Sequence, residues 1–338
     1  MLEKELQAKV KHHHVWADYL RRWSPNNRDI YHTTSKGKIE FASVKGIAME
    51  KHFYRTEWLY DSHIEIIKGF SRLSPVELQK QHMISLEGFL KRQELQAVCK
   101  KSAENSEYMS RFSQALQSNA LENIHTFIER EAKPIMSSLA ERDTSVLQDS
   151  MNMCSFCMYI GHQFTRTKAF KETILSLGEN IFSENHQSVG RCIEECWWFL
   201  SYLFGMNIGT DLHKTNQSDT HALLINDTET PFITSDQPVI NVFKSLSNVG
   251  ISPLSDEEFD LYYPISPTEA YMISKSEKYT EGLNVVSSDT VIELNTKMSR
   301  AANIHIMSCD EGSLSLLLRN IGSHRNQVIE FGKSQKIS

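Results

Sequence analysis

The stretch Phe232-Ile233-Thr234-Ser235-Asp236-Gln237-Pro238-Val239 joins two short apolar runs through a polar turn that contains proline. This pattern is typical of short strands, because β-branched and aromatic residues favour strands and proline interrupts them. Short apolar runs separated by turn residues also occur before and after this stretch. We predict strands over residues 221–225, 232–234, 239–243, 259–263, 270–273 and 304–308, with a helix over 292–302. The sequence therefore predicts a sheet-rich region over about 220–335.

The residues before this region have a helical pattern. From about 55 to 204, apolar residues recur at intervals of three and four, as in Ile64, Ile67 and Phe70, which is the spacing of one helix face. Helix-forming composition also covers residues 2–23, whereas 207–219 is polar and suggests a loop. Two short runs, 29–33 and 38–43, predict a hairpin.

The order of these segments predicts the fold class. Strands at both ends of a helical middle favour an α+β fold, with a single domain over residues 1–338. The early hairpin is expected to join the late sheet or to pack near it. We find no internal repeat.

Composition limits where the chain resides. With 338 residues and 40% hydrophobic content the chain can bury a sizeable core. Its densest apolar stretch, 196–206, is shorter than the ~20 residues of a membrane span, and residues 1–14 lack the apolar centre of a secretion signal. We expect a cytoplasmic protein with no membrane partner, whose six cysteines are reduced thiols.

The charge is unevenly distributed along the chain. The net charge is −6, but residues 1–60 carry eleven Lys and Arg against seven Asp and Glu, together with five histidines. A bulk electrostatic attraction to nucleic acid is therefore not implied. The basic segment is either an ordinary solvated surface or a local phosphate-binding face.

Several motifs, in a fixed order, resemble one family. Residues 12–24, HHHVWADYLRRWS, are similar to an opening HHYVPQFYLRNFS, and residues 44–54 to VKNVAVEKDFY. Residues 163–167, 232–239 and 263–267 are similar to QxxRT, FITSDNPV and YPLSP. The chain thus resembles a bacterial family of unknown function over about 300 residues. It departs from the pattern at His14 and Trp16, where the family has tyrosine and proline. The resemblance implies a shared fold and site but no reaction.

His12 and His13 are the first candidate site residues, because adjacent histidines on a polar segment have few packing reasons to occur together. Consecutive side chains point in different directions, so at most one is expected to face a site. We favour His13, with His12 in support. The alternative is that they are surface or structural histidines bonded to the backbone.

Asp236 is the second candidate. A carboxylate at the end of an apolar strand, before a turn fixed by Pro238, is held on a rigid support. Alternatively, Asp236 and Ser235 bond only the amides of their own turn.

Gln163 and Arg166 share a helix face, being three residues apart. A buried arginine needs a carboxylate or a phosphate. The alternative to a substrate phosphate is a salt bridge to a core acid such as Asp236 or Glu50.

The cysteine pairs 154/157 and 192/196 superficially resemble two halves of a zinc site. Both lie in apolar, helix-like sequence instead of tight turns, so we expect buried thiols and no structural zinc. No phosphate loop, HExxH or dinucleotide motif occurs in the sequence.

If these polar residues converge, they suit phosphodiester cleavage. His13 would move a proton, Arg166 would clamp the phosphate, and Asp236 would orient the imidazole or bind Mg²⁺ or Mn²⁺, with His12 and Gln163 in support. The first hypothesis is a nuclease-like effector acting on RNA or a single strand, such as a toxin of phage defence. The alternative is a non-enzymatic protein that binds a partner protein of a defence system or senses a nucleotide, with the same residues as a structural polar network. Open access to His13, Arg166 and Asp236 would favour the enzyme, and complete burial the structural network.

Overall fold

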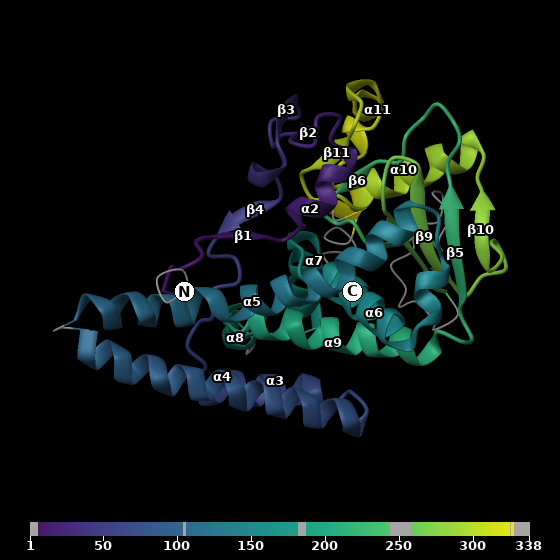
Figure 1. The fold of residues 1–338 in the computed structure, drawn as a ribbon. Coiled ribbons are helices and arrows are strands. Elements are labelled where there is room, and N and C mark those ends of the chain that lie inside the picture. Colours follow the sequence, from purple (N-terminus) through teal and green to yellow (C-terminus); the bar gives the residue numbers. More distant parts are fainter. Residues whose placement is uncertain (1–5, 104–105, 182–186, 244–257, 325, 328–338) are drawn as a thin grey trace.

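Along the chain, strands precede and follow a helical middle, and in the fold the two groups of strands lie next to each other beside the long helices (Figure 1). The computed structural model describes residues 6–103, 106–181, 187–243, 258–324 and 326–327. The helices are α2 (Ala17–Leu20), α3 (Asp61–Ser71), α4 (Val76–Ala103), α5 (Glu107–Ala140), α6 (Ser150–Thr165), α7 (Lys168–Ile181), α8 (Gln187–Glu195), α9 (Trp197–Thr215), α10 (Ser288–Ala301) and α11 (Glu311–Ser315). The strands are β1 (Lys11–His13), β2 (Asp29–Thr33), β3 (Ile39–Ser43), β4 (Met49–Lys51), β5 (Thr220–Ile225), β6 (Thr234–Ser235), β7 (Ile240–Asn241), β8 (Asp260–Pro264), β9 (Glu269–Ser274), β10 (Gly282–Val285) and β11 (Ile306–Ser308). The predicted α+β class is confirmed.

The early hairpin joins a late strand, as the sequence predicted. Among the described residues, one sheet has the order β3-β2-β11-β6. The central pairings are antiparallel, with Met307 opposite His32 and Ile306 opposite Ser235. This sheet ties β2 and β3, near the start of the chain, to the C-terminal region.

A larger sheet forms the core of the late region. Its described strands follow the order β10-β5-β9-β8-β7, and all neighbours are antiparallel except β10 and β5. Side chains alternate along β5, so that Leu223 packs with residues of α6 and α9, whereas Leu224 packs with residues of α10. Helices therefore cover both faces, which explains why the strands are apolar without a polar alternation.

Glycines allow the two central helices, α6 and α9, to approach closely. A Cβ atom added at Gly161 would lie 2.5 Å from the carbonyl oxygen of Gly205 and 2.5 Å from the amide nitrogen of Gly209. Any larger residue would force the helices apart. The Asp149 side chain caps the start of α6 by accepting from the amides of Met151 and Asn152.

Two local predictions were wrong. Residues 11–13, which fall within the predicted opening helix 2–23, form β1 instead; residues 1–5 lie outside the described part. Residues 207–215, predicted as loop, continue α9. The reason is that Gly209 and Leu212 follow Gly205 at helical spacing and face the protein interior. Burial of this narrow face stabilises the helix although the side chains on its outer face are polar.

Candidate functional site

Strand β1 directs its two candidate histidines to different environments. His12 is fully buried. Its Nδ1 accepts from the Tyr54 amide at 2.7 Å, so Nε2 carries the proton and donates to the Lys9 carbonyl at 2.9 Å. The ring also stacks on Tyr54, with 5.7 Å between the centroids. Both nitrogens are occupied, and burial lowers the pKa of His12. His12 is thus a structural link between β1 and the chain that follows β4.

His13 points the other way and is only half-buried. Its Nε2 lies 3.2 Å from the Lys45 carbonyl, which can only accept, so Nδ1 retains its lone pair. Burial lowers the pKa of His13; Arg166 and Lys11 lower it further, and the Lys45 carbonyl and Glu129 oppose them. His13 is therefore a neutral base at pH 7.

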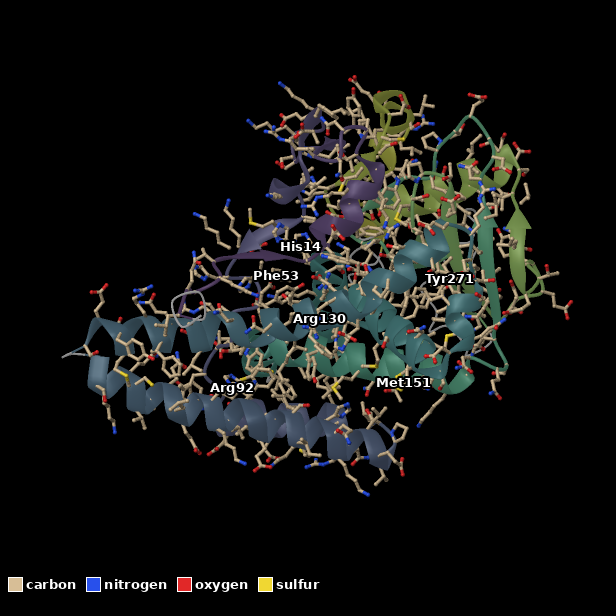
Figure 2. The ribbon with its side chains drawn as sticks, in the orientation of Figure 1. His14, Phe53, Arg92, Arg130, Met151 and Tyr271 are labelled. Carbon is tan, nitrogen blue, oxygen red and sulfur yellow. The ribbon has the colours of Figure 1, made fainter. Side chains whose placement is uncertain are left out.

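His14 lies inside the protein against Phe53, with 5.4 Å between the ring centroids (Figure 2). Burial lowers the pKa of His14 to about 3, with His305 and Arg166 adding to the effect. Its carbonyl accepts from Gln163 Nε2 at 3.1 Å. His14 thus joins the N-terminal segment to α6.

Replacing His14 with tyrosine is expected to make the protein less sensitive to acid. The pKa of His14 falls from 6.5 to about 3 on folding. Between these two pH values the unfolded state therefore binds a proton that the folded state does not bind. Stability is therefore lost as pH falls from about 6.5 towards 3, at about 1.4 kcal/mol per pH unit. Tyrosine does not titrate there, so in urea unfolding between pH 6 and 4 the slope should decrease by about this amount.

A matched control for His14→Tyr is His52→Asn. His52 is exposed and has a φ of 60°, which asparagine tolerates. This control should keep the wild-type slope. Equal slopes for wild type and His14→Tyr would contradict the assignment of His14 as a neutral buried histidine.

Arg166 ends α6 and is buried in an ion pair. Its Nη2 lies 2.7 Å from Glu129 Oε1 and donates to Gln163 Oε1 at 2.8 Å. Burial disfavours the charge, but Glu129 overcomes this and the pKa of Arg166 is raised. The prediction that Asp236 or Glu50 would be the ion-pair partner of Arg166 was wrong, because Glu50 pairs with Lys168 and Asp236 has other partners. Only 3% of the Arg166 side chain is exposed, so Arg166 is not placed to clamp a phosphate.

Asp236 anchors the loop between α10 and β11. Its Oδ1 accepts from the Asn303 amide at 2.7 Å, and its Oδ2 accepts from the amides of Ile304 and His305 at 2.8 and 2.9 Å. Burial raises the pKa of Asp236, while His305 and the three amides oppose the rise. The predicted alternative was that Asp236 bonds amides of its own turn. It was wrong, because the amides that Asp236 bonds belong to residues 303–305, far away in the sequence. With its oxygens so occupied and 3% of the residue exposed, Asp236 is poorly placed to bind Mg²⁺ or Mn²⁺.

The candidate segments contact one another through glutamine side chains that bond the backbone or a side chain of another segment. Besides the bond from Gln163 to His14, Gln237 Nε2 donates to the Phe164 carbonyl at 3.2 Å and Gln237 Oε1 accepts from Thr167. The charged groups nevertheless point apart, since Arg166 faces α5 and the Asp236 carboxylate faces residues 303–305. Four candidates, His12, Gln163, Arg166 and Asp236, therefore have structural partners, and only His13 is half-exposed.

Sequence reasoning missed Glu129 and its neighbour Glu122, both on α5. Burial raises the pKa of Glu122 to about 7, with Arg166 lowering it and Glu129 raising it. Nothing in the sequence distinguishes these acids from the other glutamates of a long helix. His305 was missed too; its Nδ1 lies 2.6 Å from the Thr33 carbonyl.

Three of the four paired cysteines lie on helices, as expected, but the expectation of buried thiols was wrong for Cys154 and Cys192, which are only half-buried. Cys154 and Cys157 lie in α6, Cys192 lies in α8, and Cys196 directly precedes α9. Burial raises the pKa of Cys157 and of Cys196 to about 12, so both remain thiols. That the two pairs do not combine into one structural zinc site stays a prediction.

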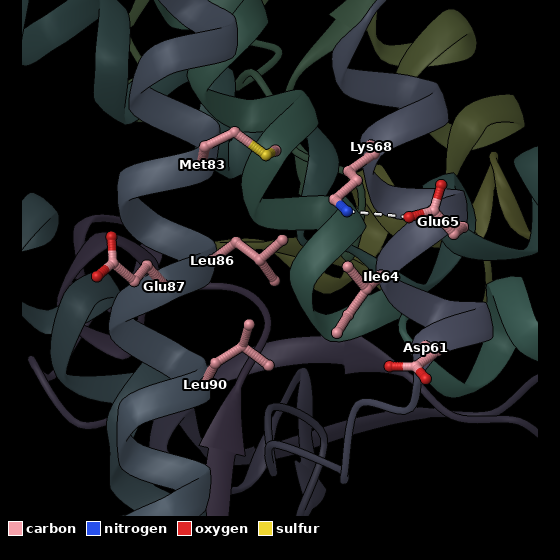
Figure 3. Close-up of a pocket in the computed structure, with 8 residues that line it drawn as sticks. All are labelled: Asp61, Ile64, Glu65, Lys68, Met83, Leu86, Glu87 and Leu90. Atoms are coloured by element: carbon pink, nitrogen blue, oxygen red, sulfur yellow. Dashed lines mark hydrogen bonds and ion pairs between the residues drawn. The ribbon is translucent and has the colours of Figure 1, made fainter.

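A surface groove of about 380 Å³ lies between α3 and α4, away from the candidate residues (Figure 3). Apolar side chains line it together with charged ones, of which Lys68 and Glu65 form an ion pair of 2.9 Å. The lining residues are Asp61, Ile64, Glu65, Lys68, Met83, Leu86, Glu87 and Leu90. None of them is a residue that the sequence singled out.

Comparison with known proteins identifies a family but no activity. Within the described residues, every helix is too short or too polar to cross a bilayer. No curated protein and no solved structure matches the chain. One family model, described as "Protein of unknown function (DUF4238)", matches residues 11–312, which span the hairpin, the helical middle and both larger sheets. The chain therefore belongs to the DUF4238 family of proteins of unknown function.

Proposed function

We propose that the protein binds a single-stranded nucleic acid through the two-stranded β1–β4 ribbon, and that its buried polar residues hold this ribbon on the helical body. One observation carries the proposal. Lys11 and Lys51 are exposed cross-strand neighbours in the ribbon, and Lys11 lies close enough to His13 to lower its pKa.

The lysines form an uncompensated positive patch. Like charges directly opposite each other on a ribbon repel, and a bound phosphate would relieve that repulsion. Lys45, whose carbonyl lies beside His13, is exposed as well. Among the described residues, none of these three lysines forms an ion pair. Because the whole chain has a net charge of −6, the contact is local, which suits a short exposed strand better than a long duplex.

The ribbon is held rigidly to the body. His12 bonds the Tyr54 amide from below, Gln163 bonds the His14 carbonyl from α6, and Lys168 pairs with Glu50 at 3.2 Å. His12 and Gln163 are among the residues that would otherwise be taken as catalytic. Both are buried, whereas Lys168 and Glu50 pair at the surface. Together these bonds support a platform role, because they position the exposed lysines.

Removing the two lysines is expected to weaken binding and its salt dependence together. We expect Lys11→Gln/Lys51→Gln to reduce the slope of log K against log salt by about 1.4, since each phosphate neutralised on a single strand contributes about 0.7. Fluorescence anisotropy with a labelled oligonucleotide measures this slope. The matched control is Lys36→Gln/Lys38→Gln at the exposed turn of the β2–β3 hairpin, which should bind as wild type does. Equal slopes for both double variants, or no binding by wild type, would refute the proposal.

His13 favours a second candidate, a nuclease-like effector of phage defence. It offers a neutral imidazole whose Nδ1 keeps a free lone pair, with Lys11 close enough to lower its pKa, so it can act as a base at neutral pH. The same binding samples can be incubated with total RNA, single-stranded DNA and plasmid, with and without Mg²⁺ or Mn²⁺. Cleavage that His13→Gln abolishes would support the nuclease; an uncleaved but bound strand supports the binding protein.

A further inference from the structure

We propose that His63, Cys192 and Glu195 form a zinc site between α3 and α8, distinct from the basic ribbon. Cys192 and Glu195 are three residues apart on α8, so they share one helix face. That face packs on α3, where His63 is the third residue. The fold therefore brings an imidazole, a thiol and a carboxylate together from two helices.

The three ligand atoms are spaced for one ion. His63 Nε2 lies 3.0 Å from Glu195 Oε2, and the three ligand atoms lie within 4.8 Å of one another. Zinc bonds of about 2.0–2.3 Å in a tetrahedral site place neighbouring ligands roughly 3.3–3.8 Å apart. The observed separations, 3.0 Å for His63–Glu195 and at most 4.8 Å for the other two pairs, are within about 1 Å of this geometry.

The ligand chemistry selects zinc among common biological cations. A thiolate with an imidazole and one carboxylate favours Zn²⁺, whereas Mg²⁺ and Ca²⁺ prefer sites made of oxygen atoms. The side chain of Glu195 is 40% exposed, so water can take the fourth position. This donor set differs from the Cys192/Cys196 pair considered from the sequence, since Cys196 is fully buried and takes no part.

The neighbouring Arg191 side chain already orients the Glu195 carboxylate. Arg191 Nε holds Glu195 Oε1 at 2.8 Å, which leaves Oε2 directed at His63. The Arg191 bond holds the Glu195 carboxylate in an orientation in which Oε2 can bind a metal. Such supporting bonds around a ligand commonly tune the affinity for the ion.

Metal binding requires two protons to move. In the metal-free protein, His63 Nδ1 accepts from the Tyr60 amide at 3.2 Å, so Nε2 carries the proton and donates it to Glu195. On binding, that proton moves to Nδ1 and the Tyr60 bond is given up, while the Cys192 proton is released to solvent. Zinc affinity should therefore rise with pH.

Zinc content of purified protein tests the proposal. The protein is stripped with EDTA, reloaded with ZnCl₂ and analysed by mass spectrometry. We expect about one equivalent in wild type, none in Cys192→Ser, and none in His63→Gln, in which glutamine can still cap α3 from the same position. Arg191→Ala should weaken binding about tenfold. Reloading with Co²⁺ should give a thiolate charge-transfer band in wild type that Cys192→Ser lacks.

Cys154→Ser is the matched control, because Cys154 is also half-buried but lies in α6. It should keep the zinc and the cobalt band. Thermal unfolding gives a second readout, since ZnCl₂ should raise the Tm of wild type and of Cys154→Ser but not of Cys192→Ser, and MgCl₂ should raise none. Zinc retained by Cys192→Ser, or no zinc bound by wild type, would overturn the proposal.

Discussion

Replacing Glu129 with glutamine is expected to lower the free energy of unfolding by about 3–5 kcal/mol. The reason is that Arg166 would keep a charge with only 3% of its side chain exposed and no counter-charge at 2.7 Å. Desolvation makes an unpaired buried charge far more costly than an exposed one. Urea unfolding at constant m-value measures the loss.

Two further variants sharpen the Glu129 test. Glu131→Gln is the matched control on the same helix, because Glu131 pairs with Arg130 at an exposed position. It should change stability by less than about 0.5 kcal/mol. Glu129→Gln/Arg166→Met should recover part of the loss, since an apolar side chain replaces the orphaned charge. If Glu129→Gln costs no more than Glu131→Gln, the buried ion pair does not contribute as we argue.

Asp236→Ala is expected to cost about 3 kcal/mol or more. The substitution leaves three backbone amides, those of residues 303–305, without the acceptor they now have. Each unsatisfied buried donor costs about 1–3 kcal/mol. Because these amides lead into β11, the hairpin β2–β3 should loosen as well. Urea unfolding measures the loss of global stability, and hydrogen exchange of the β11 amides measures the local loosening.

The matched control for Asp236 is Asp310→Ala. Asp310 accepts from the Ser313 amide at the exposed start of α11, so losing this cap should cost about 1 kcal/mol. Equal costs for the two alanine variants would contradict the anchoring role of Asp236. The comparison also shows why His13 is the better residue for testing nuclease activity: an Asp236 variant would lose activity through unfolding alone.

Local patterns in the sequence predicted most of the framework. The hairpin at 29–33 and 38–43, the strand near 221–225 and the helix near 292–302 each carry a complete signal of spacing and turn residues, so each is found close to its predicted place. The short strands β4 and β10 were missed, because a strand of three or four residues is too short to display an alternation.

Local sequence patterns did not predict the secondary structure of residues 11–13. Helix-forming composition favoured a helix over residues 11–13, but pairing with β4 made them a strand. A composition preference of a few tenths of a kcal/mol per residue is easily outweighed by tertiary pairing. Once β1 forms, alternation turns His12 inward and His13 towards the surface.

The sequence by itself indicated that Arg166, in an apolar helical stretch, would need a negatively charged partner, because a buried charge cannot remain unsatisfied whatever the fold. It also determined the family, through motifs kept in order along the chain. Only the tertiary structure decided that Glu129 pairs with Arg166, and that the amides of residues 303–305 bond Asp236. The reason is physical: partner choice depends on how helices and loops distant in the chain pack together, and a glutamate on a long helix has the same local sequence signature whether it faces solvent or a buried arginine.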